Sequence, residues 1–162
     1  MTARTSAGLL MFRRRNETLE VLLVHPGGPY FRNKDEGAWT IPKGEATEGE
    51  NLLERARIEF AEELGMPVDG EWMALGTVKQ KGGKTVHAWA FAGDLGDDFK
   101  LVSNTFEMEW PPRSGKMQAF PEVDRAEFFS IAEARLKMNA AQTVFLDRLL
   151  ELLDSQDRKN LM

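Results

Sequence analysis

The chain has 162 residues with 26 acidic and 21 basic side chains, a formal net charge of −5, no cysteine and only two histidines. Without cysteine it can form no disulfide, no thiol nucleophile and no metal site that needs thiolate ligands. Its acidic balance is unfavourable for general nucleic-acid binding, and no apolar run approaches the ~20 residues that span a bilayer. Any chemistry must therefore use carboxylates, Lys and Arg, or a metal held by oxygen atoms.

The length fits one domain, which we expect over residues 1–153, followed by a polar tail at 154–162. No repeat, low-complexity tract or linker divides the chain. The apolar run at 9–12 is short and is followed by three arginines, so we expect no signal peptide and take the cytoplasm as the default location.

The expected strands form two hairpins and some shorter pieces. Strands are predicted at 6–12 and 19–24, with the three arginines of the stretch between them in a solvated turn. A second hairpin is predicted from 72–79 and 85–92 around a Gly-rich turn. The remaining expectations are a Gly- and Pro-rich loop from 25 to 37, short strands at 39–41 and 127–129, and an irregular polar stretch at 93–121.

Helix-capping signals mark the expected helices. Thr47 and Glu50 match a capping box and predict a helix start near Thr47, and Gly65 fits the left-handed residue that ends a helix. Ser130 begins a second capping box for a helix over 131–138, and a terminal helix is expected up to about residue 153. Strands mixed with helices predict an α/β or α+β fold.

The first predicted helix carries a group of carboxylates. On a helical wheel, Glu59, Glu62 and Glu63 share an arc of about 100° beside the apolar stripe of the helix. Three like charges within one helical turn repel one another, and Mg²⁺, which prefers hard oxygen ligands, would relieve that repulsion. The alternative interpretation is a solvated acidic face.

The context of these glutamates resembles a known signature. Gly44, Glu50, Glu59, the pair Glu62-Glu63 and Gly65 follow the order and spacing of G-x5-E-x7-R-E-U-x-E-E-x-G-U, where U is bulky and apolar. This is the signature of the Nudix hydrolase family. Residues 103–115 are also similar to a bacterial branch of predicted NTP pyrophosphohydrolases. The resemblance covers most of the chain.

The resemblance implies an α/β/α sandwich with a mixed sheet and a carboxylate-bearing loop–helix. It implies hydrolysis of a diphosphate linkage by water, in a nucleoside diphosphate linked to another group, such as a dinucleoside polyphosphate or an NTP. Mg²⁺ or Mn²⁺ is the implied cofactor. The implied ligands are the side chains of Glu59, Glu62 and Glu63 and the backbone carbonyl of Lys43.

Further site residues are implied by the same resemblance. Family members often add a carboxylate before the last strand, as ligand or base, and Glu122 is the first candidate ahead of Glu109 and Glu107. Gly44 is expected to allow a sharp backbone turn. Glu50 is expected to support the loop–helix junction without a catalytic role.

One fixed position of the signature differs, because Ile58 stands where the family has Arg. Arg55 lies four residues before Glu59, inside the carboxylate arc, and we expect it to substitute in part. The alternative that Ile58 leaves open is a catalytically weak or silent Nudix-fold module that binds a nucleotide or a protein.

Cations and aromatic residues near the signature are candidates for substrate binding. Lys43 is the first candidate for phosphate contact, and the further candidates are Arg32, Lys34, Lys79 and Lys81. Aromatic side chains could stack on a base, with core packing as the alternative; they are Tyr30, Phe31 and Trp39. The expected partner is a small nucleotide or polyphosphate. A homodimer stays open, as does a role of residues 93–121 as lid, dimer contact or specificity loop.

Overall fold

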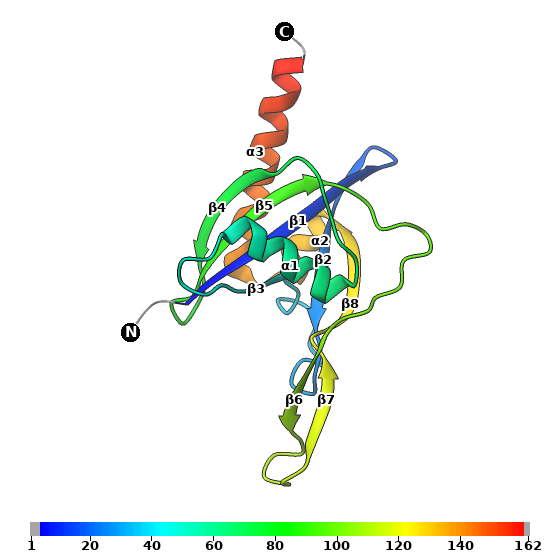
Figure 1. Ribbon diagram of the computed structural model, residues 1–162. Helices are drawn as coiled ribbons and strands as arrows, with labels where there is room; N and C mark the ends of the chain where they lie inside the picture. The colour runs from blue at the N-terminus through cyan, green and yellow to red at the C-terminus, as the bar shows by residue number, and fades with distance from the viewer. Residues whose placement is uncertain (1–3, 161–162) are drawn as a thin grey trace.

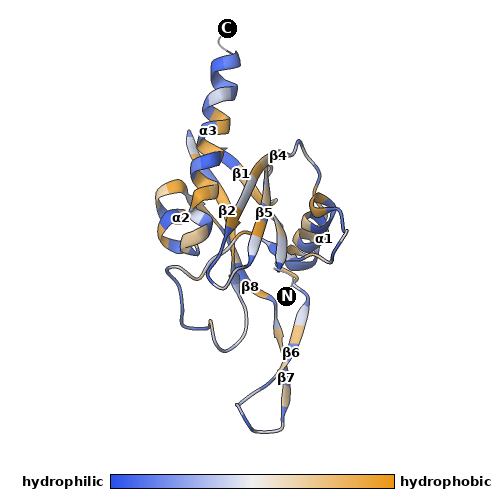
Figure 2. Ribbon diagram, turned by 90° about the vertical axis from the view of Figure 1, so that its left-hand side faces the viewer, coloured by the Kyte–Doolittle hydropathy of each residue, from blue (hydrophilic) through white to orange (hydrophobic). Residues whose placement is uncertain are grey.

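A mixed β-sheet forms the centre of the protein, and helices cover both of its faces (Figures 1 and 2). The computed structural model describes residues 4–160. The strands of the sheet are β1 (Thr5–Arg15), β2 (Thr18–Pro26), β3 (Lys43–Glu45), β4 (Met73–Lys79), β5 (Thr85–Ala92) and β8 (Val123–Ser130). Their order is β4-β5-β1-β2-β8, and β3 pairs with β1 beside this path. Because β1 and β5 are parallel and the other neighbours antiparallel, the predicted mixed sheet is confirmed.

Each face of the sheet has its own apolar core. Helix α1 (Leu52–Leu64) packs on one face, where it buries Ala56, Phe60 and Leu64. Helices α2 (Ile131–Lys137) and α3 (Thr143–Asn160), with a 3-10 turn at Ala140–Gln142 between them, cover the other face. Burial on both faces explains the continuous apolar run in β1, since alternate side chains enter opposite cores.

The first hairpin is tighter than the sequence indicates. Its turn consists of Asn16 and Glu17, which both have positive φ (51° and 66°). Arg13 therefore lies inside β1, where its guanidinium contacts Glu20 at 2.8 Å and Asp94 at 2.7 Å. The prediction that all three arginines form a solvated turn is wrong, because a two-residue turn leaves them on the strand.

Helix α1 begins later than predicted. Asn51 is its N-cap and accepts from the Glu54 backbone N–H at 2.9 Å, so the start near Thr47 is wrong. The Thr47 N–H still donates to Glu50 Oε1 at 2.9 Å, in a turn that Gly49, with φ 81°, separates from the helix. The predicted end is confirmed, because Gly65 has φ 80° and its N–H donates to the Ala61 carbonyl.

A separate hairpin projects from the body of the protein, at the bottom of Figure 1. It is formed by β6 (Thr105–Glu109) and β7 (Met117–Pro121), within the stretch 93–121 that was expected to be irregular. The Asn104 N–H donates to the Glu62 carbonyl at 3.0 Å, which ties the base of the hairpin to α1. The prediction of an irregular segment is therefore wrong for the hairpin strands.

The remaining short elements agree only partly with the predictions. The segment expected as a strand at 39–41 makes isolated bridges, and the strand follows Pro42 instead. Ser130 caps α2 as predicted. The expected tail continues α3 to Asn160, so it is helical where it is described, and residues 1–3 and 161–162 of the predicted segments lie outside the described residues. Within the described chain, no helix has the length and apolar character of a membrane span.

Candidate active site

A cavity of about 380 Å³ lies where α1, β3 and the base of the β6–β7 hairpin meet. We call it the carboxylate cavity. Its lining residues are Lys43, Gly44, Glu45, Glu59, Glu62, Glu63, Asn104, Thr105 and Glu122. The structure therefore brings together Glu59, Glu62, Glu63 and the first-ranked further candidate, Glu122, although Glu122 is distant from the others in the chain.

Gly44 is required by a close approach to Glu59. A Cβ atom at position 44 would lie 2.0 Å from the carboxyl carbon of Glu59 and within 2.4 Å of both its oxygens. Gly44 lies in β3 and is not among the residues with positive φ. The expected reason, a sharp backbone turn, is therefore wrong; the glycine is needed because a side chain would occupy the place of the carboxylate.

Glu63 is the most strongly perturbed carboxyl group of the cavity. Its Oε2 accepts the Lys43 backbone N–H at 3.1 Å. Burial raises the pKa of Glu63 to about 8, which the nearby Lys43 ammonium only partly opposes. Burial, followed by the charge of Glu62, also raises the pKa of Glu59. The cavity thus holds more carboxylate than its own cations neutralise.

Arg55 contacts two glutamates of the signature, in which Ile58 stands at the position of the usual arginine. Its Nε and Nη2 donate to Glu50 Oε2 at 2.8 and 2.5 Å, and its Nη1 donates to Glu59 Oε1 at 3.2 Å. The bond from Arg55 and the backbone N–H of Thr47 lower the pKa of Glu50 to about 2. Glu50 is therefore ionised and paired with Arg55. The Ile58 side chain is half-buried.

The donor set suits a hard divalent cation, although it is not arranged as a closed cage. Among residues 4–160, no three His, Cys, Asp or Glu side chains are placed as a ready metal site. The reason is that Glu59 turns toward Arg55 and Glu63 toward the Lys43 N–H. Carboxylate oxygens in a cavity with excess negative charge are nevertheless the ligands that Mg²⁺ and similar cations prefer.

Comparison with known proteins decides the family. The model of the NUDIX domain matches residues 2–149. The chain belongs to the NUDIX domain family. The expected class, a pyrophosphohydrolase, is confirmed at this level, and enzymes of the family generally need a divalent metal. None of the curated proteins matches the chain.

Solved structures show the same Nudix fold at low sequence identity. An Ap4A hydrolase from C. elegans, in a binary complex, is 20% identical with a TM-score of 0.65, covering 94% of this chain and 98% of that one. The NUDIX domain of Shewanella oneidensis NrtR, complexed with ADP ribose, is 15% identical with a TM-score of 0.61 and coverages of 94% and 90%. The C-terminal domain of mouse MUTYH, in complex with human PCNA, is 16% identical with a TM-score of 0.59 and coverages of 94% and 91%.

Several residues predicted to bind substrate lie away from the carboxylate cavity of this Nudix domain. Trp39 is 1% exposed, packs edge-on against Phe129 and donates its Nε1–H to Asp35, so its predicted stacking on a base is wrong. The cavity lining also excludes the four further candidate cations and the two lower-ranked carboxylates, which are Arg32, Lys34, Lys79, Lys81, Glu107 and Glu109. These six are exposed, on the loop after β2, around the β4–β5 turn and on β6.

Sequence reasoning missed three residues that line the cavity. Asn104 and Thr105 enter it from the base of the hairpin, and Glu45 follows Gly44 on β3. Lys84 also acts on the site, since its charge, after burial, lowers the pKa of Lys43. The positions of Asn104 and Thr105 in the chain carry no signal, because the hairpin reaches the cavity only through tertiary contacts.

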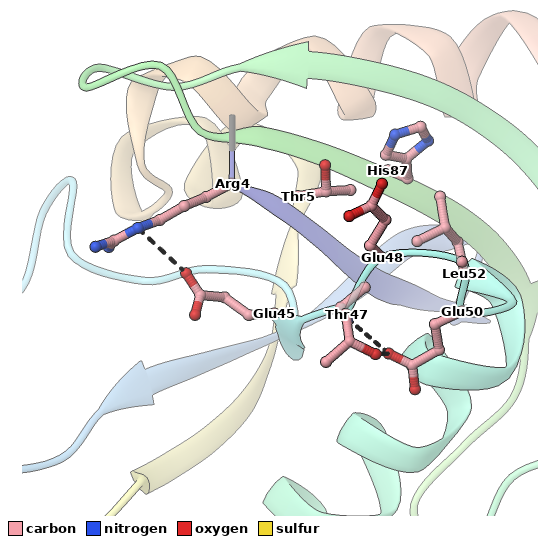
Figure 3. A pocket seen from close by; sticks show the side chains of 10 residues that line it. Arg4, Thr5, Glu45, Thr47, Glu48, Glu50, Leu52 and His87 are labelled. Carbon is pink, nitrogen blue, oxygen red and sulfur yellow. Dashed lines mark hydrogen bonds and ion pairs between the residues drawn. The ribbon is translucent and has the colours of Figure 1, made fainter. Parts of the chain in front are cut away.

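A second hollow, of about 660 Å³, is larger and lies against the loop between β3 and α1 (Figure 3). It is lined by side chains from the start of β1, this loop and β5; those labelled are Arg4, Thr5, Glu45, Thr47, Glu48, Glu50, Leu52 and His87. In Figure 3, Glu48 points to the side of His87, while Glu50 turns toward Thr47. This hollow holds none of the clustered α1 glutamates, so its size does not make it the reaction site.

Proposed function

We propose that this Nudix protein hydrolyses a diphosphate linkage in a nucleotide with a divalent cation held in the carboxylate cavity. One observation carries the proposal: the cavity is lined by five glutamates and a single lysine. Such a surface repels a polyphosphate by itself. It accepts one only when a metal ion stands between the two sets of oxygens.

The protein residues have distinct roles in this proposal. Glu59, Glu62 and Glu63, with the backbone carbonyl of Lys43, would hold the cation, which is Mg²⁺ or Mn²⁺. When bound, the cation supplies charge neutralisation for the phosphates and lowers the pKa of water. Arg55 fixes the orientation of Glu59, and Gly44 leaves room for that carboxylate.

Two further groups act on the substrate. The Lys43 ammonium is half-buried at the cavity and would bind a phosphate oxygen, which restores the positive charge that burial and Lys84 disfavour. The Glu122 carboxylate is exposed at the end of the hairpin and would accept the proton of the attacking water. Water then attacks phosphorus, and the bond to the bridging oxygen breaks.

The proposed substrate is a nucleoside diphosphate linked to another group. The nucleotide-linked names of two relatives with this fold, an Ap4A hydrolase and a domain complexed with ADP ribose, support this class. The alternative is a catalytically weak or silent module that binds a nucleotide or a protein; a domain of this fold is seen in complex with a protein in the MUTYH–PCNA structure. Ile58 supports that alternative, but Arg55 already contacts Glu59 and all box glutamates are present.

A nucleotide panel tests the proposal. Diadenosine tetraphosphate, ADP-ribose and ATP are incubated with the protein and Mg²⁺ or Mn²⁺, and the products are resolved by chromatography. We expect hydrolysis of at least one compound, lost on chelation with EDTA and restored by added cation. If no compound is hydrolysed with either cation, the proposed activity is rejected and the result favours the silent binding module.

A further inference from the structure

The loop after β2 lies directly against the β6–β7 hairpin and forms a wall with it. The Gly27 N–H donates to the Glu122 carbonyl at 3.0 Å, and a Cβ at position 27 would lie 1.9 Å from the Pro121 carbonyl oxygen. A Cβ at position 28 would lie 3.0 Å from the ring of Phe106. The two glycines therefore allow an approach that any side chain at position 27 would prevent. We call residues 26–31 and 105–121 the hairpin wall.

An aromatic pair stands at the outer end of the hairpin wall. The rings of Tyr30 and Trp110 meet edge to face, with centroids 5.4 Å apart and planes at 80°. Tyr30 is 59% exposed and Trp110 is half-buried. A pair that served only as core would be covered, so much of this aromatic surface is available to a ligand.

A lysine shares the face of the hairpin that carries this pair. The Trp110 N–H donates to the Lys116 carbonyl at 2.9 Å, which makes the two residues direct neighbours across the hairpin. Directly opposed residues of antiparallel strands project from the same face. Lys116 is exposed, as is Arg113 in the turn between them. Aromatic rings beside cations are the combination that binds bases and their phosphates.

The hairpin wall is continuous with the carboxylate cavity. The hairpin starts at Thr105 and ends directly before Glu122, and both of these residues line the cavity. At about 3.4 Å per strand residue, Trp110 stands roughly 17 Å beyond Thr105. A single nucleoside with its phosphates in the cavity does not need this reach. A molecule with a second nucleoside beyond its phosphate chain does.

We propose that Tyr30, Trp110 and Lys116 form a second binding site, which takes the distal nucleoside of a dinucleoside polyphosphate. This inference rests on the proposed function, because it assigns the part of the same substrate that lies farthest from the reacting phosphorus. The base stacks on the aromatic pair, and Lys116 binds the phosphate next to that nucleoside. The hairpin wall then selects long substrates over nucleoside triphosphates.

Binding measurements test the site without turnover. The affinities of non-hydrolysable analogues of diadenosine tetraphosphate and of ATP are measured by calorimetry with Mg²⁺. We expect Tyr30→Ala/Trp110→Ala to weaken the dinucleotide about tenfold, since removing an aromatic platform has an effect of this size or more, and to leave the ATP analogue unchanged. Lys116→Ala is expected to weaken the dinucleotide about threefold, and Tyr30→Phe/Trp110→Phe to keep the affinity.

Glu107→Gln is the matched control, because Glu107 alternates with Phe106 and Met108 and so lies on the opposite face of the same hairpin. It should change neither affinity. Thermal unfolding of each variant verifies that the hairpin variants fold, and Lys116→Ala, with its expected threefold loss for the dinucleotide alone, carries the test if the double alanine variant does not fold. Equal loss for both analogues would show that the wall only shapes the cavity and would overturn the proposal.

Two other results also overturn it. One is no loss for either analogue. The other is a change of oligomeric state in sedimentation, which would make the patch a contact between copies of this chain. The binding assay separates this inference from the proposed activity: hydrolysis without discrimination rejects the second site alone, whereas discrimination in binding without hydrolysis of any nucleotide rejects the activity alone.

Discussion

The two hollows beside the β3–α1 loop differ in whether a protein cation neutralises their carboxylates. In the larger hollow, Glu50 is held by Arg55, which keeps its pKa at about 2. In the carboxylate cavity, Glu63 accepts only a backbone N–H from Lys43, and burial raises its pKa to about 8. The same short signature thus contains one neutralised and one uncompensated carboxylate. The position without a protein counter-charge is the one that suits a divalent cation.

The largest expected effect comes from Glu63, the carboxylate without a protein counter-charge in the carboxylate cavity. Glu63→Gln removes a carboxylate proposed to bind the cation and should lower kcat more than about a hundredfold, since even the groups that support metal ligands contribute 10- to 100-fold. Glu48→Gln is the matched control on the larger hollow and should keep kcat within about twofold. Metal-dependent product release checks both variants. Similar losses in the two would abolish the distinction between the hollows.

Arg55 connects the two hollows, because it contacts both Glu50 and Glu59. Arg55→Ala should lower turnover and weaken metal activation by about 10- to 100-fold, since Glu59 loses the group that orients it. Arg57→Ala is the control: Arg57 lies on the same helix and pairs with Glu54 at 3.4 Å, away from the cavity. Titration of activity against Mg²⁺ measures the effect. Unchanged metal activation in Arg55→Ala would show that Arg55 does not substitute for the arginine that the family has at the position of Ile58.

Gly44 tests whether space in the cavity matters as much as charge. Gly44→Ala places a Cβ within 2.4 Å of the Glu59 carboxylate, so that side chain must move, and turnover should fall about tenfold. Gly96→Ala is the matched control, because nothing lies within 4 Å of a Cβ there and its φ is not positive. Its stability should change by no more than about 0.5 kcal/mol. Wild-type activity in Gly44→Ala would mean that Glu59 works from another position.

The local part of this site was predictable from the sequence. The glutamates of α1, the apolar stripe below them and the left-handed Gly65 all follow from helical spacing and capping chemistry. The strands of both hairpins of the main sheet also followed from their apolar residues and the turn residues between them. These features depend on neighbours within a few residues, which the sequence displays directly.

The parts that were not predicted depend on distant contacts. The β6–β7 hairpin belongs to a separate two-stranded sheet, and its pairing is supported by the loop after β2 rather than by a strong apolar pattern of its own. Trp39 was placed near a ligand because it precedes the signature, yet its ring faces the core beside Phe129. The helix start moved to Asn51 because Gly49, at φ 81°, interrupts the first capping box.

A pH dependence of stability is expected in the metal-free protein, and it bears on folding rather than on turnover. Burial raises the folded-state pKa of Glu63 from 4.5 to about 8, so between these values the folded state holds a proton that the unfolded chain has released. The free energy of unfolding should therefore fall as the pH rises from about 5 to about 8, since stability decreases where the folded state binds more protons. Glu59, whose pKa is also raised, contributes in the same direction.

Other groups do not reverse this expectation within that range. Glu50, with a pKa of about 2, is ionised in both states above pH 5 or so and contributes no slope there. Lys43, whose pKa burial lowers, acts in the opposite direction at higher pH, so the measurement stops near pH 8.

Urea unfolding at several pH values, with and without Mg²⁺, measures the slope of the free energy of unfolding against pH. Glu63→Gln should flatten it, and Mg²⁺ should stabilise the wild type most at the upper end, because the ionised carboxylate is the form that binds the cation. If Glu63→Gln has the same slope as the wild type, another group causes the pH dependence of stability. The contrast between Glu63 and Glu50 would then be wrong.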